Sequence, residues 1–173
     1  MRLRRVTRTA LAGLAAILLA GAGPAAAHSP SAGGQGAQPA AGTFVAEVDF
    51  ATLEARDVRG NKCEFTVSGT LVLTGTLDGS AVGTTTAVIF APCADALANP
   101  PGTYLDVFRF EGDFSGEVLG EAVTGPFSYA GVTRVGGDID ATMVLDGDAA
   151  RAVLRADAQV AVGGTYSGVA KPS

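Results

Sequence analysis

The sequence predicts an all-β protein, an antiparallel meander of about eight strands that closes into a small barrel. Three observations support this fold class. Apolar and polar residues alternate with period two, glycine-rich turns separate the alternating runs, and helical patterns are nearly absent after the N-terminal segment. Because each strand has one apolar face, the sheet must fold onto itself to bury that face. A two-sheet β-sandwich meets the same requirement and stays open as the alternative.

The first 27 residues have the pattern of a cleavable signal peptide. Four arginines come first, residues 10–23 form a short apolar run, and Ala25 and Ala27 fit the −3 and −1 positions of a cleavage site. This run is too short and too rich in Ala and Gly for a spanning helix, and no later segment is apolar for long enough. We therefore expect a secreted protein with no membrane span after signal cleavage.

Residues 28–42 consist of small and uncharged polar residues without apolar periodicity, apart from His28 at the start. Such a segment buries too little apolar surface to offset the entropy lost on ordering, so we expect a flexible linker. The predicted barrel domain follows and covers residues 43–171, a length that suits one domain.

The charge balance argues against nucleic acid as a partner. The chain has 12 basic and 17 acidic residues, and four of the basic ones lie in the predicted signal peptide. The mature protein then keeps eight basic residues and has a formal net charge of −9. A surface this acidic repels phosphate backbones.

Four runs show the strand alternation most clearly, namely residues 44–50, 62–73, 105–114 and 138–146. Side chains alternate across a strand, so each run has one buried and one wet face. The predicted inward residues are Phe44, Ala46, Val48 and Phe50; Cys63, Phe65, Val67, Leu71 and Leu73; Phe108, Phe110 and Phe114; and Ile139, Ala141, Met143 and Leu145.

Turn signals separate the runs at four glycine dipeptides: Asp78-Gly79, Gly136-Gly137, Asp146-Gly147 and Gly163-Gly164. The only helical signal in this part of the sequence is a single turn at residues 94–98, which leads into a loop with two adjacent prolines. The other glycines inside the runs suit the bends of a small barrel.

The two cysteines, Cys63 and Cys93, predict one disulfide. A metal or thiol-redox pair is the alternative, but the C-x-x-C spacing is absent and no histidine is nearby in the sequence. The bridge would close a loop of about 30 residues and stabilise the fold by about 3–4 kcal/mol in the chain-entropy model.

The stretch from about residue 108 to 171 carries short glycine-bounded strands: FEGDFSGEV, VTGPFSYAGV, GGDIDATMVL and VGGTYSGVAK. In this succession of short strands and glycines, and most of all in the closing Gly-Gly-x-Tyr-x-Gly, the chain resembles the small barrels related to allene oxide cyclase and the dirigent proteins. The resemblance implies a barrel. It also implies either a cyclase or isomerase that shapes a small molecule, or a protein without catalysis. None of that group's catalytic residues matches a position here.

No residue set predicts a catalytic or metal site. A lone histidine on a linker cannot serve a Ser–His triad, and it lacks the second histidine of a copper brace. Sequence parity places the paired acidic residues on the outer, wet face, and calcium-loop spacing is absent. We assign no catalytic residue, no metal ligand and no cofactor. The acidic residues considered are Glu111, Asp113, Asp138, Asp140, Asp146 and Asp148.

Five aromatic residues are candidates to line a cavity for an apolar ligand: Phe108, Phe110, Phe114, Phe127 and Tyr129. The alternative is that they fill the core, because a small barrel has little room beyond its own side chains. The chain has no Trp, which disfavours the exposed aromatic platforms of sugar-binding modules.

Three functions remain. The first is a non-catalytic binder of a small apolar molecule or an envelope component, the second a cyclase or isomerase, and the third a structural or adhesive envelope protein. A cavity with an inward carboxylate or Arg would favour the second, an apolar cavity the first, and a filled core with an exposed apolar patch the third. The alternation along the strands predicts no charged residue on the inward face, and we therefore rank the binder above the enzyme. The oligomeric state is left unassigned.

Overall fold

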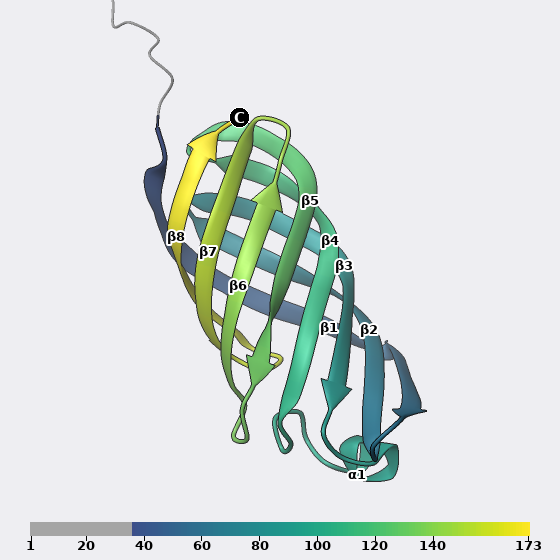
Figure 1. The fold of residues 1–173 in the computed structure, drawn as a ribbon. Coiled ribbons are helices and arrows are strands. Elements are labelled where there is room, and N and C mark those ends of the chain that lie inside the picture. Colours follow the sequence, from purple (N-terminus) through teal and green to yellow (C-terminus); the bar gives the residue numbers. More distant parts are fainter. Residues whose placement is uncertain (1–35) are drawn as a thin grey trace, which may run out of the picture. The chain divides into compact units, whose positions relative to one another are not determined.

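The computed structural model describes residues 36–173, which contain eight strands and one short helix. In chain order they are β1 (Gln38–Val58), β2 (Lys62–Gly75), β3 (Leu77–Ile89), α1 (Cys93–Ala98), β4 (Asp106–Val118), β5 (Glu121–Thr133), β6 (Asp138–Asp146), β7 (Ala150–Gln159) and β8 (Gly163–Pro172). Each strand pairs antiparallel with the next, and β1 also pairs with β8, which closes the barrel (Figure 1). The predicted meander barrel is confirmed, and the sandwich alternative is wrong.

The barrel has two ends, which we name the α1 end and the C-terminal end (Figure 1). The α1 end carries helix α1 and the β1–β2, β5–β6 and β7–β8 turns. The C-terminal end carries the end of β8 and the β2–β3, β4–β5 and β6–β7 turns. Most of the largest fully buried side chains lie in the C-terminal half, namely Leu73, Leu77, Phe114, Val118, Val123, Met143, Leu145 and Leu154.

Strand β1 begins at Gln38, inside the segment predicted as a linker over residues 28–42. Its first residues pair with β8, from Gln38 opposite Ala170 to Gly42 opposite Tyr166. The linker prediction is therefore wrong for residues 38–42. A ladder uses backbone groups, so small side chains do not prevent pairing. The predicted signal peptide, residues 1–27, lies outside the described residues, as does His28.

Beyond Val45, β1 no longer pairs with β8 and continues along β2. Its register against β2 shifts between Asp49 and Glu54, as at a β-bulge. The paired ends of β1 and β2 extend past the rest of the sheet at the α1 end (Figure 1). This irregular segment borders the site described below.

Two of the four predicted turns, at Gly136-Gly137 and Asp146-Gly147, lie in or at the edge of turns. Asp78-Gly79 lies inside β3 instead. The chain reverses before this dipeptide, directly after Gly75, whose φ of 112° favours glycine. Gly163-Gly164 forms the start of β8. Glycine pairs suit strands whose backbones approach closely as well as turns, so the dipeptide alone does not separate the two.

A second, smaller core lies at the α1 end around the predicted disulfide. Cys63 in β2 is joined to Cys93 at the start of α1, with their Cα atoms 4.7 Å apart. Cys63 packs with Ile89, Ala91 and Ala96. The bridge therefore fastens α1 to the barrel. Among the described residues, no helix is long and apolar enough to cross a membrane.

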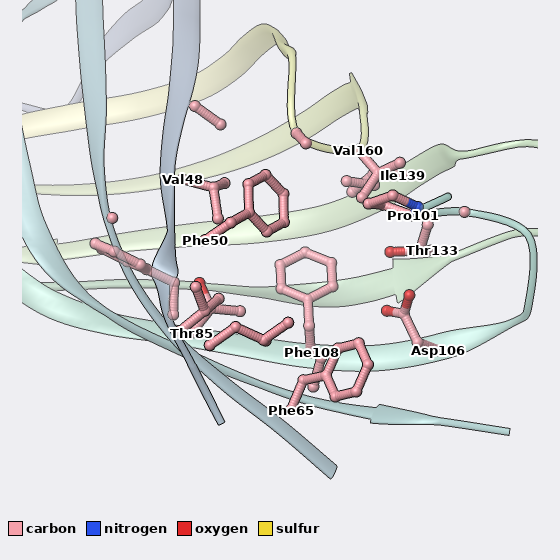
Figure 2. Close-up of a pocket in the computed structure, with 18 of the residues that line it drawn as sticks. Val48, Phe50, Phe65, Thr85, Pro101, Asp106, Phe108, Thr133, Ile139 and Val160 are labelled. Carbon is pink, nitrogen blue, oxygen red and sulfur yellow. The ribbon is translucent and has the colours of Figure 1, made fainter. Parts of the chain in front are cut away.

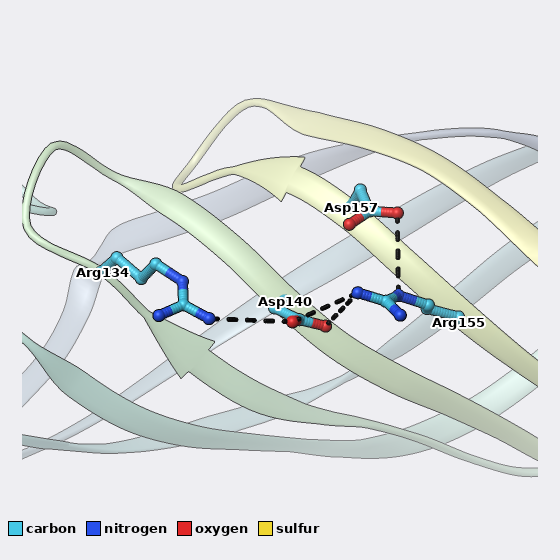
Figure 3. A network of polar contacts seen from close by, with 4 residues as sticks. All are labelled: Arg134, Asp140, Arg155 and Asp157. Carbon is cyan, nitrogen blue, oxygen red and sulfur yellow. Dashed lines mark hydrogen bonds and ion pairs between the residues drawn. The ribbon is translucent and has the colours of Figure 1, made fainter.

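The outer surface carries the acidic residues, as parity predicts. Glu111, Asp113 and Asp138 are exposed, and Asp140 is partly exposed. Figure 3 shows Asp140 between two arginines, at 3.8 Å from Arg134 and 3.3 Å from Arg155. Such exposed ion pairs contribute little to stability, at most about 1 kcal/mol each.

Candidate functional site

A cavity of about 340 Å³ opens at the α1 end of the barrel. Its walls are the inward side chains of the strands at this end, and the loop after α1 covers part of its mouth (Figure 2). Most of the lining is apolar and much of it is aromatic. The principal aromatic lining residues are Phe44, Phe50, Phe65, Phe108, Phe110 and Tyr129.

Three inward glycines mark the boundary between the cavity and the filled half. Gly69 lies opposite Gly83, and Gly83 lies opposite Gly112, so β2, β3 and β4 lack side chains at one level. A Cβ on Gly83 would lie 2.1 Å from the Glu111 carbonyl oxygen, which shows how closely β3 and β4 approach there. Glycine at these positions permits the tight bend of the sheet and leaves room inside it.

The structure divides the five predicted cavity aromatics into two groups. Phe108, Phe110 and Tyr129 line the cavity. Phe114 and Phe127 stack on each other with their ring centroids 6.4 Å apart and do not line the cavity, although they share one core cluster with Phe110 and Tyr129. The aromatic lining from β1 and β2, which comprises Phe44, Phe50 and Phe65, was predicted as inward but was not among the cavity candidates.

One inward carboxylate corrects the prediction that no charge faces inward. Asp106, the first residue of β4, is only 8% exposed and lines the cavity beside Thr133, its neighbour on β5 (Figure 2). Burial raises the pKa of the Asp106 carboxyl to about 6, and a hydrogen bond from the Thr133 hydroxyl opposes part of that rise. The sequence does indicate this orientation, because Asp106 lies on the same face of the strand as Phe108 and Phe110.

The hydroxyl of Tyr129 has no hydrogen-bond partner among the described residues, although the side chain is only 5% exposed. Its ring packs edge-on against Phe44 and Phe108, at centroid distances of 5.5 and 5.0 Å. Burial also raises the pKa of this hydroxyl, so it remains a protonated donor. Buried polar groups without a partner are rare in folded proteins, because each one lowers the stability of the fold.

The loop over the mouth is held at both sides. On one side, the Cys63–Cys93 disulfide fastens α1 to β2. On the other, the Gly136 N–H donates to the Gly102 carbonyl oxygen at 2.9 Å, which ties the loop to the β5–β6 turn. Pro100 and Pro101 stiffen the part of the loop that lines the cavity. The mouth therefore has a fixed rim on this side.

The arrangement offers binding and proton transfer, but no metal site is evident. No group of three or more His, Cys, Asp or Glu residues that could hold a metal ion occurs within residues 36–173. The polar residues that line the cavity include Asp106, Thr85 and Thr133. A carboxyl with a pKa near neutrality in an apolar cavity can give or take a proton.

Comparisons of the chain with known protein families, with curated proteins and with solved structures each find no match. The resemblance to the allene oxide cyclase and dirigent barrels therefore stays a prediction, and the site must be interpreted from its own geometry.

Proposed function

We propose that this protein is an exported barrel that binds a small, mainly apolar molecule in the cavity at its α1 end. The observation that carries the proposal is the cavity itself, whose volume of about 340 Å³ is within the usual range for small-molecule sites. Its lining is aromatic and aliphatic with a few polar groups, the usual composition of such sites. A purely structural barrel is expected to fill its interior with side chains, and this half is unfilled.

Export is supported by two independent features. The N-terminal pattern predicts a signal peptide, and the Cys63–Cys93 disulfide is the kind of bond that persists in oxidising compartments. Mass spectrometry of the protein recovered from its host's culture medium under native conditions tests both. We expect a chain that begins at His28, carries an oxidised cysteine pair and retains a small molecule. A chain found only inside cells with reduced cysteines would contradict the export proposal.

A matched pair of substitutions tests binding in this cavity. Thr85 of β3 lines the cavity, whereas its neighbour Thr86 is exposed on the outer face. Thr85→Phe should fill the space and weaken binding of the neutral fluorescent probe N-phenylnaphthylamine roughly tenfold or more. Thr86→Phe adds the same group outside and should leave binding unchanged. Equal affinity in both variants would show that the probe does not bind in the cavity.

Asp106 favours a second candidate, a cyclase or isomerase. Its carboxylate faces inward although no inward charge was predicted, and its pKa of about 6 suits a general acid or base near neutral pH. The test is deuterium exchange from D₂O at the carbon next to the carbonyl of tetralone, which an enolising base accelerates. Exchange that is faster with the wild-type protein than with Asp106→Asn would support catalysis. Equal exchange rates for the two proteins, with ligand binding retained in both, would support the non-catalytic binder over the enzyme.

A further inference from the structure

The Asp106 carboxyl is an acidic group in the cavity wall for which the described chain provides no positive partner. The residue lines the cavity and is only 8% exposed. Among the described residues, those that line the cavity include no Lys, Arg or His. None of the ion pairs found within residues 36–173 includes Asp106, and the hydroxyl of Thr133 that donates to it is neutral. An ionised carboxylate in an apolar site is unfavourable unless a cation accompanies it.

The Asp106 carboxyl faces the cavity and can still accept hydrogen bonds. Figure 2 shows it directed from β4 toward Thr133 and toward the space beside Phe108. Neither of its oxygens is both fully enclosed and without a partner, in contrast to the Tyr129 hydroxyl. A carboxylate accepts up to about four hydrogen bonds, so the bond from Thr133 leaves acceptor capacity for a ligand.

The surroundings of Asp106 favour an organic cation over a metal ion. A metal ion needs several ligands, and residues 36–173 contain no group of three or more His, Cys, Asp or Glu that could hold one. An organic ammonium group needs only one carboxylate, and the skeleton attached to it can occupy the apolar remainder of the cavity. Phe108 is the next inward residue of β4, and the face of an aromatic ring attracts cations.

A positive charge on the ligand also fits better than a neutral donor. A ligand hydroxyl could donate to Asp106, but the negative charge would then remain unbalanced in the apolar site. A protonated amine donates hydrogen bonds and balances the charge at the same time. The chain as a whole has 17 acidic and 12 basic residues, so its electrostatic field attracts cations and repels anions.

We propose that the cavity selects apolar molecules that carry a protonated amine, and that the Asp106 carboxylate accepts hydrogen bonds from this amine and balances its charge. This inference rests on the proposed binding function and specifies the ligand class. Asp106 is the residue that determines selectivity, while the apolar lining provides contact for the rest of the molecule.

The test uses two probes with the same aromatic skeleton, 1-naphthalenemethylamine and 1-naphthalenemethanol, titrated by calorimetry at neutral pH. The first is a cation and the second is neutral. The ratio of their affinities is measured for wild type, for Asp106→Asn and for the control Asp113→Asn, whose side chain is exposed on the outer face of the same strand. We expect Asp106→Asn to reduce the preference for the amine roughly tenfold or more. Asp113→Asn removes the same charge outside the cavity and should leave the ratio unchanged.

A crystal structure of the wild-type protein with the bound amine provides a second readout that does not depend on a variant. The ammonium nitrogen should lie within hydrogen-bond distance of an Asp106 carboxyl oxygen, about 2.7–3.2 Å. An ammonium group directed to solvent at the mouth, or a ratio that Asp106→Asn leaves unchanged, would show that the amine inference is wrong while the binding function stands. If neither probe nor N-phenylnaphthylamine binds the wild-type protein, the binding function fails, and the inference fails with it.

Discussion

The two halves of this barrel are built from the same eight strands with the same alternation, yet one interior is filled and the other is hollow. In the C-terminal half, side chains such as Phe114, Leu73 and Met143 interlock and are almost completely buried. In the α1 half, the rings stand along the walls and enclose about 340 Å³ of space. Strand pattern therefore sets which residues point inward, while their size and the inward glycines determine whether they meet.

The tyrosines show the same difference at the level of one hydroxyl. Tyr166 lies toward the C-terminal end, where backbone groups of Thr74 and Leu77 surround its oxygen. Tyr129 is a residue of the cavity wall, but its oxygen is itself buried and has no hydrogen-bond partner among the described residues. The filled half therefore provides hydrogen-bond partners for its tyrosine hydroxyl, and the hollow half does not.

The largest expected effect comes from a comparison of two phenylalanines on β4, one in each half of the barrel. Phe114→Ala removes a ring from the packed core and should lower the free energy of unfolding by about 3–5 kcal/mol. Phe108→Ala, on the same face of β4, removes a ring that already borders empty space and should lower it by only about 1–2 kcal/mol. Urea denaturation of both variants measures the difference. Equal losses would contradict the distinction between a filled and a hollow half.

Removal of the disulfide should affect the α1 end most. The double substitution Cys63→Ala and Cys93→Ala should lower the free energy of unfolding by about 3–4 kcal/mol, since the bridge closes a long loop. It should also increase amide hydrogen exchange in α1 and the following loop, with little change in β6 and β7. Uniform loss of protection across the barrel would show that the disulfide does not act locally.

Asp106 should make the stability of the hollow half depend on pH. The carboxyl has its ordinary pKa of 3.8 when unfolded and a pKa of about 6 when folded. Between these values the folded state binds more protons, so its stability falls as pH rises through this window. From about pH 4 to about pH 7, wild type should lose roughly 2 kcal/mol relative to Asp106→Asn.

Denaturation of both proteins across this pH range measures the predicted difference. Asp148 does not interfere, because hydrogen bonds from the Thr124 N–H and hydroxyl lower the pKa of its carboxyl and place its titration below the window. Parallel pH profiles for wild type and Asp106→Asn would mean that Asp106 is not held in an apolar site.

The smallest expected effects have opposite signs at the two tyrosines. Tyr166→Phe leaves the buried Leu77 N–H without its acceptor and should lower the free energy of unfolding by about 1–2 kcal/mol. Tyr129→Phe removes an unpaired hydroxyl and should raise the stability of the ligand-free protein by up to about 1 kcal/mol. Thermal unfolding of the two variants tests the signs. A loss at Tyr129 would indicate a partner for its hydroxyl.

Much of the fold was predictable because alternation and turn chemistry are local. The barrel, the disulfide and the inward parity of Phe108 and Phe110 all followed from the sequence pattern. The start of β1 did not, because residues 38–42 are ordered by pairing with β8, which is far away in the chain. The separation of Phe114 from Phe108 did not either, since parity does not show at which level the interior is filled.

The polar groups of the site were harder to predict from the sequence, for a different reason. Asp106 shares the parity of the inward phenylalanines and was predictable in principle, but an acidic residue at a strand end is expected to be solvated. Thr133, its partner on β5, lies beside it in the hairpin, but the other walls of the cavity come together only in the closed barrel. The unpaired state of the Tyr129 hydroxyl depends on every neighbouring side chain, and no local pattern encodes it.

Crystals of the wild-type protein under xenon pressure show whether the α1 half is hollow, because xenon enters apolar cavities that are otherwise empty. We expect xenon at the α1 end among Phe44, Phe108 and Tyr129, none between Phe114 and Leu73, and loss of the site in Thr85→Phe. Xenon absent from the α1 end, with side chains closed over that space, would show that both halves of the barrel are filled.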